Sequence, residues 1–280
     1  WFAVDGAHPT GAVHHQKIIV VDDVLAFCGG IDLTIDRWDT PEHLDPNGIR
    51  RTLGRPYGPR HEVAVAVDGA AARALGEQAR TRWRTATTQA VAPIEDAQRI
   101  WPPGLEPDLR HIDVGIARTA PALKAGSEVR EVEALNLAAI AAARHTIYLE
   151  NQYFTSPMVA GALAMRLAEP DGPEVVLIST GQSPSWFDQL TMDRARSNML
   201  WRLRSADVFG RFRAFYPTTP SGTKIIVHSK VTVVEDVVAR VGSANLNNRS
   251  GGFDTEAEIA AGLIAPIMAY PLIENAIRRD

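Results

Sequence analysis

The sequence contains very little cysteine and no long hydrophobic run, and both absences narrow what the chain can be. Cys28 is the single cysteine among 280 residues, which excludes an intramolecular disulfide and a cysteine-rich zinc site. No apolar stretch approaches the ~20 residues that a membrane-spanning helix needs, and no signal peptide is recognisable. These features do not determine the cellular compartment. A cytoplasmic or peripheral membrane location is favoured, and a missing N-terminal targeting segment is compatible with either.

Runs of basic residues are also absent. Lys and Arg together number 29 against 33 Asp and Glu, the net charge is −4, and the two signs are interleaved along the chain. Nucleic-acid binding usually depends on a concentrated basic surface. Nucleic acid is therefore not an expected partner, although a small basic pocket is compatible with this composition. The oligomeric state cannot be inferred from these features.

Hydrophobic periodicity predicts strands that alternate with helices, which is typical of an α/β fold. A proline-rich stretch at residues 91–108 interrupts the pattern and is interpreted as a linker. Helices are expected at residues 70–86, 129–143, 158–168 and 186–206, and strands at residues 114–117, 146–150 and 174–179.

The most informative feature is a long-range internal repeat. Residues 15–22 (HQKIIVVD) are followed after six residues by GGID at 29–32, and residues 228–235 (HSKVTVVE) are followed after six residues by GSAN at 242–245. Each lysine comes two residues after its histidine, so on a strand both side chains leave the same face. The acid then begins a turn, and the return strand ends at a glycine where the backbone can approach a ligand. Two copies in matching register indicate a functional site.

A further acidic residue follows each copy. Glu62 precedes the alternating run Val63–Val67, and Glu256 precedes the similar run Ala257–Leu263. Each copy therefore contributes a histidine, a lysine and a later carboxylate at the start of a strand.

These motifs resemble those of the phospholipase D superfamily. The two copies are similar to its paired HxKxxxxD motifs, and the match extends to the eukaryotic-like phospholipases D and bacterial relatives, including cardiolipin synthase-like proteins. Two departures stand out: Glu235 occupies the usual aspartate position, and Gly30 and Asp32 replace serine and asparagine in the first copy. The supporting stretches are GGIDL (29–33), DRWD (36–39), IYLENQYF (147–154), GSANLNNRS (242–250) and DTE (254–256).

The resemblance implies a duplicated α-β-α sandwich with two halves related by an approximate two-fold axis and the active site at their seam. Residues 1–110 are expected to form the first half, ending in the proline-rich linker, and residues 111–280 the second. Only 14 residues precede His15, so the first half is expected to be N-terminally incomplete.

Cleavage of a phosphodiester needs a nucleophile, an acid for the leaving oxygen and positive groups for the phosphoryl oxygens. His15 and His228 can supply the first two, because histidine titrates near neutrality. The other candidates are Lys17, Lys230, Asn245 and Ser243 for the phosphoryl oxygens, Glu62 and Glu256 as acids behind the imidazoles, and Asp22 and Glu235 as motif acids that brace the turns.

The resemblance further implies a covalent phosphohistidine intermediate, with His15 as nucleophile and His228 as acid, and no metal or cofactor. The residues alone leave the assignment of the two histidines open. The leading hypothesis is a phospholipase D-type enzyme that acts on phospholipid head groups at a membrane surface, with water or an alcohol as acceptor. A cardiolipin synthase-type transferase is the alternative, and a nucleic-acid phosphodiesterase is less favoured. A degenerate scaffold protein is disfavoured because both histidines and both lysines are present.

Several other residues are given structural interpretations. His61 is interpreted as structural although it adjoins Glu62. Core packing is the favoured interpretation for five aromatic side chains: Trp38, Tyr153, Phe154, Trp186 and Phe187.

Overall fold

The computed structural model describes residues 1–122, 128–183, 185–235 and 237–262. Two sheets dominate these residues. The larger has eight strands in the order β11-β10-β9-β13-β14-β15-β7-β8, and the smaller has three in the order β1-β2-β6. The α/β fold expected from the sequence is confirmed. No helix in the described part of the chain has the length and hydrophobicity needed to cross a membrane.

The larger sheet is mixed. Strand β10 pairs in parallel with β9 and β11, whereas β13, β14, β15 and β7 pair antiparallel in series, with β13 beside β9. Its strands are β7 (Val114–Ala120), β8 (Val129–Arg130), β9 (Thr146–Asn151), β10 (Glu174–Ser179), β11 (Phe212–Phe215), β13 (Lys230–Val234), β14 (Val238–Gly242) and β15 (Glu256–Gly262).

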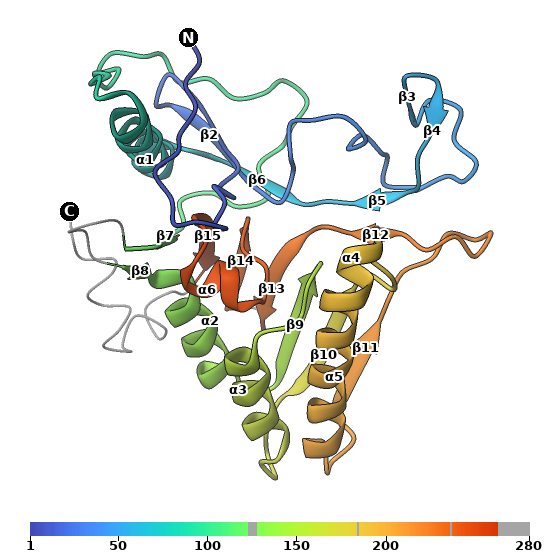
Figure 1. Ribbon diagram of the computed structural model, residues 1–280. Coiled ribbons are helices and arrows are strands. Elements are labelled where there is room, and N and C mark those ends of the chain that lie inside the picture. Colours follow the sequence, from blue (N-terminus) through green and yellow to red (C-terminus); the bar gives the residue numbers. More distant parts are fainter. Residues whose placement is uncertain (123–127, 184, 236, 263–280) are drawn as a thin grey trace.

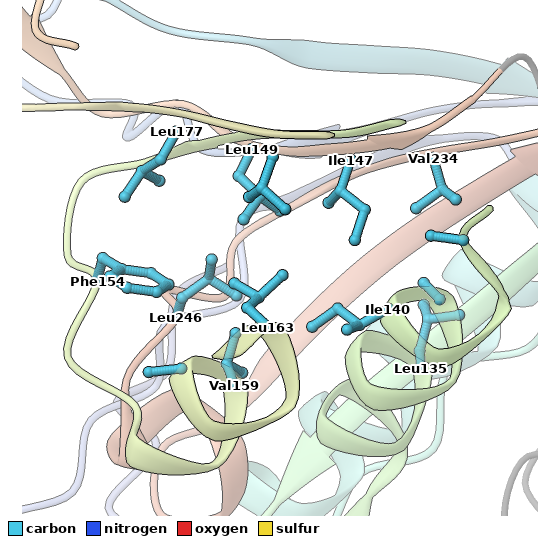
Figure 2. Close-up of a cluster of buried hydrophobic side chains, with 14 of the residues drawn as sticks. Leu135, Ile140, Ile147, Leu149, Phe154, Val159, Leu163, Leu177, Val234 and Leu246 are labelled. Atoms are coloured by element: carbon cyan, nitrogen blue, oxygen red, sulfur yellow. The ribbon is translucent and has the colours of Figure 1, made fainter. Parts of the chain in front are cut away.

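Helices cover one face of this sheet (Figure 1). They are α2 (Glu131–Ala142), α3 (Pro157–Leu167), α4 (Trp186–Asp188), the π-helical turn η1 (Gln189–Asp193) and α5 (Arg194–Ala206); the short α6 (Asn248–Gly252) follows β14. Figure 2 shows Leu135 and Leu163 from the helices facing Ile147 and Leu149 from the sheet, all of them buried. Burial of such side chains stabilises the layer by about 1.5–3 kcal/mol each.

The smaller sheet packs against the larger one: its strands β2 and β6 contact β14, and β2 also contacts β15. It consists of β1 (Ile18–Val21), β2 (Leu25–Gly29) and β6 (Ala64–Asp68), and the long helix α1 (Gly69–Thr87) follows it. The buried side chains that join these parts include Ala26, Cys28, Leu75 and Ile259. Short strands complete the fold: β3 (Arg51–Thr52), β4 (Arg55–Pro56), β5 (Arg60–His61) and β12 (Ile226–Val227).

The sequence repeat corresponds to one strand pattern formed twice. In β1–β2 Ile19 pairs with Phe27, and at the equivalent positions of β13–β14 Thr232 pairs with Arg240. The third strand is added at the same register, with Gly29 opposite Ala64 in one copy and Gly242 opposite Glu258 in the other.

Most of the expected elements are present, with small changes at their ends. Ser156 caps α3 by accepting a 3.3 Å hydrogen bond from the amide of Val159, and residues 91–108 form neither helix nor strand. The long helix expected at 186–206 is instead divided by the π-helical turn η1. The helix expected from residue 129 begins at Glu131, because the two preceding residues form β8. Leu263, the end of the last expected strand, lies outside the described residues.

Candidate active site

The second-half histidine lies where the two halves exchange backbone hydrogen bonds. Strand β12 pairs in parallel with β5 of the first half, and the amide of His228 donates to the carbonyl of His61 across 2.9 Å. This pairing brings the residue after His61 alongside the histidine. Nδ1 of His228 lies 2.5 Å from Oε1 of Glu62, and both side chains are more than nine-tenths buried.

The histidine of the first half makes the equivalent contacts with the second half. His14 forms a parallel bridge with Thr255, and the amide of His15 donates to the carbonyl of Thr255 across 3.0 Å. Nδ1 of His15 then lies 3.1 and 3.0 Å from the two carboxylate oxygens of Glu256. Each histidine is therefore paired with the acid of the other half.

The two lysines make matching contacts. Nζ of Lys17 donates to the carbonyl of His15 across 2.8 Å, and Nζ of Lys230 donates to the carbonyl of His228 across 2.5 Å. Lys17 also forms a 3.2 Å ion pair with Asp32. Each ammonium group is thus fixed beside its own histidine, where it can hold a phosphoryl oxygen.

Glu256 is enclosed by hydrogen-bond donors. The hydroxyl groups of Ser243 and Ser250 donate to its two oxygens across 2.5 Å. Burial would raise the pKa of Glu256, but the hydrogen bonds from His15 and these hydroxyl groups outweigh it and hold the pKa below its usual value. Ser243 was predicted to bind the phosphate. It is fully buried against Glu256 instead, so it supports the acid behind His15.

The environment of His228 is more deeply buried. Burial and the neighbouring Lys230 hold the pKa of His228 well below its usual value, which favours the neutral imidazole. Burial also lowers the pKa of Lys230 to about 7 and raises that of Glu62. A bound phosphate anion would oppose the shifts of His228 and Lys230, since it favours their positive forms.

Asn245 and Gly30 occupy comparable turns after β14 and β2. The side-chain oxygen of Asn245 is buried without a hydrogen-bond partner. This oxygen can only accept a hydrogen bond, so donation to a phosphoryl oxygen falls to the side-chain nitrogen. A Cβ at Gly30 would lie 2.7 Å from the carbonyl oxygen of His228 and 2.8 Å from Oε2 of Glu62. The first turn therefore requires glycine where the second has Ser243, because His228 and Glu62 fill that space.

Asp22 and Glu235 lie away from this cluster. They sit in the β1–β2 and β13–β14 turns, with positive φ angles of 50° and 53°, at the opposite strand ends from Lys17 and Lys230. Oε1 of Glu235 accepts hydrogen bonds from the amides of Arg144 and His145. Their inclusion among the catalytic candidates is corrected by this placement, and their position agrees with the bracing role expected for them.

Comparison with known proteins gives the family. Residues 137–269 match the family described as "Cardiolipin synthase, PLD-like domain". Phospholipase D1 of Schizosaccharomyces pombe is 26% identical over 341 aligned positions, which cover 89% of this chain and 24% of that protein. Phospholipase D alpha 4 of Arabidopsis thaliana is 24% identical over 361 positions, covering 91% of this chain and 46% of that protein. Residues 137–269 are thus a PLD-like domain, and the chain is similar to phospholipases D over about nine-tenths of its length.

The fold of the chain is also similar to that of a solved structure. Phosphatidylserine synthase of Haemophilus influenzae Rd KW20 aligns with a TM-score of 0.59 and 14% identity, over 99% of this chain and 64% of that protein. At this identity the similarity concerns the fold. The chain spans less than half the length of the two phospholipases D named above.

A further histidine–carboxylate pair between the halves was not predicted. Nε2 of His61 lies 2.9 Å from Oε2 of Glu150, and Oε1 of the same carboxylate accepts a 2.6 Å hydrogen bond from the hydroxyl of Tyr148. The hydrogen bond to Glu150 raises the pKa of His61. Burial opposes ionisation of Glu150, yet its partners lower its pKa to about 2. His61 therefore links β5 to β9, one residue before Glu62.

A groove of about 2110 Å³ lies between α1, β6 and residues 97–121, and none of His15, Lys17, His228 and Lys230 lines it. Among the described residues, no group of three or more His, Cys, Asp or Glu side chains is arranged to hold a metal ion. The candidate site is recognised by its paired polar residues.

The aromatic side chains divide into buried and exposed sets. Phe154 is fully buried, as expected, and Tyr153 is partly buried. Trp38 is 47% exposed, Trp186 72% and Phe187 66%. The expectation of core packing is wrong for these three residues. Trp186 and Phe187 form the start of α4, which continues through η1 into α5 (Figure 1).

Proposed function

We propose that this protein cleaves or transfers phosphodiesters of phospholipid head groups through a phosphohistidine intermediate. The observation that carries the proposal is the crossed arrangement, in which two histidines, each held at Nδ1 by a carboxylate, lie beside two lysines. The PLD-like domain and the similarity to phospholipases D support the reaction class.

Substrate binding follows from the charges. The phosphate of the substrate lies between Lys17 and Lys230, and the amide of Asn245 donates to one of its oxygens. Ammonium groups fixed by backbone carbonyls need little rearrangement as charge develops on the phosphoryl oxygens. Binding of this anion also favours the protonated form of His228, which its buried position otherwise opposes.

The first chemical step uses the two free ring nitrogens. Because Nδ1 of each histidine faces a carboxylate, Nε2 is the nitrogen available for chemistry. Nε2 of His15 attacks phosphorus and forms the P–N bond, while the P–O bond to the leaving alcohol breaks. The proton on Nε2 of His228 passes to the departing oxygen. Glu256 stabilises the positive charge on the His15 ring.

The second step reverses these roles. His228, now neutral, takes a proton from the acceptor, whose oxygen attacks phosphorus as the P–N bond breaks and His15 is released. Water as acceptor gives hydrolysis to phosphatidate, and an alcohol gives transphosphatidylation. A cardiolipin synthase-type reaction, in which the acceptor hydroxyl belongs to another lipid, is the second candidate, supported by the description of the matching family.

The exposed aromatic residues support a lipid surface as the partner. Trp186, Phe187 and Leu190 are each more than half exposed on α4 and η1, and tryptophan and phenylalanine favour the membrane interface. The hydroxyl of Thr180, a few residues before α4, donates to the carbonyl of Val227. This contact joins the base of the aromatic segment to the residue that precedes His228.

One experiment tests both steps. Phosphatidylcholine, phosphatidylglycerol and single-stranded DNA are incubated with the protein, with and without ethanol, and the products are separated by thin-layer chromatography. Phosphatidate, replaced by phosphatidylethanol when ethanol is present, is the expected result. The protein, denatured at mildly alkaline pH because a P–N bond hydrolyses in acid, should carry the phosphatidyl group on a peptide that contains His15. Cleavage of DNA alone, or no cleavage of any substrate, would refute the proposal.

A further inference from the structure

Three polar side chains, one each from β13, β14 and β15, are buried together. Thr232 and Arg240 are 2% exposed, and Glu258 is fully buried. Nη1 of Arg240 donates to Oε2 of Glu258 across 3.0 Å, and its Nη2 donates to the hydroxyl of Thr232 across 3.0 Å. None of the three belongs to the candidate catalytic set.

Glu258 also reaches the turn that follows β14. Its Oε1 accepts a 2.5 Å hydrogen bond from the amide of Ala244. A Cβ at Gly242 would come within 2.4 Å of the Glu258 carboxylate, so the glycine makes room for this contact. The held amide lies between Ser243, which supports Glu256, and Asn245.

The first half forms the same hairpin without such a trio, and its equivalent positions are more exposed, with Ile19 at 40%. The repeat register matches Thr232, Arg240 and Glu258 with three apolar residues of the first half: Ile19, Phe27 and Ala64. All three positions are polar in one hairpin and apolar in the other. A buried ion pair is often no more stabilising than apolar side chains of similar volume, so stability alone gives little reason for the trio.

We propose that Glu258, held by Arg240 and Thr232, is a positioning residue for the proposed phosphate site. By fixing the amide of Ala244 it sets the turn that directs Ser243 toward Glu256 and Asn245 toward the substrate. The first half has no serine in its turn and therefore no such contact to maintain. This inference rests on the proposed function, but the anchoring of the turn can be measured independently of it.

Two matched double variants separate the anchor from the ion pair. Arg240→Met with Glu258→Gln removes both charges and keeps an oxygen for the Ala244 amide, whereas Arg240→Met with Glu258→Leu removes that oxygen as well. Arg80→Met with Asp23→Asn is the control, because it removes another buried ion pair at the β1–β2 turn, away from the site. Hydrolysis of bis(4-nitrophenyl) phosphate, thermal melting and hydrogen exchange of the Ala244 amide are measured for each.

The glutamine variant should keep kcat within about fivefold of the parent protein, since it retains the hydrogen bond. The leucine variant should lose about 10- to 100-fold in kcat, because small displacements of catalytic groups are costly. Its Ala244 amide should also exchange faster than in the glutamine variant. The control should melt at a lower temperature with kcat unchanged.

Equal kcat in the glutamine and leucine variants would overturn the inference and leave the proposed function standing. If the parent protein fails to cleave the probe, the proposed function is in question, and exchange at Ala244 then decides the inference. Equal exchange rates in the two double variants would refute the anchoring role.

Discussion

The hairpins β1–β2 and β13–β14 have the same strand register, but the side chains at three equivalent positions differ in polarity. In the first half Ile19, Phe27 and Ala64 occupy the positions behind the hairpin, and in the second half these positions hold the hydrogen-bonded trio of Thr232, Arg240 and Glu258. The histidine, lysine and later carboxylate are present in both. Backbone register and the reactive groups are thus shared by the halves, whereas the residues that support them differ.

The halves also differ in charge and exposure at the site. The turn after β2 carries Asp32, which forms an ion pair with Lys17, and the turn after β14 carries the neutral Asn245 at the same position. The side chain of His15 is 24% exposed, whereas that of His228 is 8% exposed. A symmetric backbone therefore provides two histidines with different surroundings, as the proposed nucleophile and the proposed acid require.

Removal of either histidine should have the largest effect. His15→Ala and His228→Ala should each abolish detectable turnover, because acid–base and nucleophilic groups typically contribute ~10²–10⁴ or more. With a 4-nitrophenyl ester, whose leaving group needs no acid, His228→Ala should still form the phosphoenzyme and His15→Ala should not. The exposed His145→Ala serves as control. The opposite pattern would exchange the two roles.

The crossed acids should have the next largest effect. Glu256→Gln and Glu62→Gln should each lower kcat by ~10²-fold, since a carboxylate fixes the tautomer of its histidine and stabilises the imidazolium. Nitrogen-15 spectra of the imidazoles test the crossing directly. Glu256→Gln should shift the Nδ1 resonance of His15, and Glu62→Gln that of His228. Shifts within the same half would contradict the crossed geometry.

Exchange of the acid and amide between the two turns tests the charge asymmetry. Asp32→Asn frees Lys17 from its ion pair, so the affinity for orthophosphate should rise about 3- to 10-fold, in line with the value of one partly exposed charge. Asn245→Asp places a new anion in the site and should weaken binding by at least as much. Asp36→Asn, in the same loop, is the control. Isothermal titration gives the affinities, and equal effects of Asp32→Asn and Asp36→Asn would contradict this prediction.

The aromatic end of α4 should affect only substrates at an interface. The double change Trp186→Ala and Phe187→Ala should raise KM on phosphatidylcholine vesicles about 3- to 10-fold, because interfacial binding scales with the apolar area buried. KM for bis(4-nitrophenyl) phosphate should not change. Trp201→Ala is a matched control, since Trp201 is equally exposed at 71% but lies further along α5. A similar effect of the control would remove any special role of α4.

The His61–Glu150 pair should have the smallest effect, on stability and its pH dependence. The pKa of His61 is raised from 6.5, so its contribution is present below that pH and is lost as pH rises through the folded value. The pKa of Glu150 is lowered from 4.5 to about 2, so its contribution is lost as pH falls. His61→Asn should cost about 1 kcal/mol or less, most clearly at pH values of about 5–6.

The stability difference between the parent protein and His61→Asn is obtained from melting temperatures measured from acidic to alkaline pH. It should shrink on both sides of its maximum. A difference that is independent of pH would show that His61 acts by packing alone.

Much of the fold could be predicted from local sequence patterns. The histidine, acid and glycine spacing predicted both hairpins, because a strand, a three-residue turn and a return strand leave a regular pattern. Ser156 and Pro157 marked the start of α3 for equally local reasons. The partner of each histidine could not be predicted in this way. Glu62 and Glu256 were identified as candidates, but only the pairing of β12 with β5, and of His14 with Thr255, shows that the acids are crossed.

The remaining errors have the same origin. Ser243 follows a strand and precedes Asn245, so its position suggested contact with the substrate, whereas its hydroxyl turns inward to Glu256. Helical periodicity also could not show that Trp186 lies at a projecting end of its helix. The link between His61 and Glu150 joins residues 89 positions apart, and no local pattern indicates which distant side chain a histidine will meet.

The crossed pairing has a consequence for how such a chain can change over generations. Each half carries a histidine and a lysine, but the acid that completes its histidine is encoded in the other half. A substitution at Glu62 therefore impairs the ring at position 228, and one at Glu256 impairs the ring at position 15. Neither copy of the motif can accumulate substitutions at its acid without impairing the histidine of the other copy. The residues exchanged across the seam must therefore be inherited together.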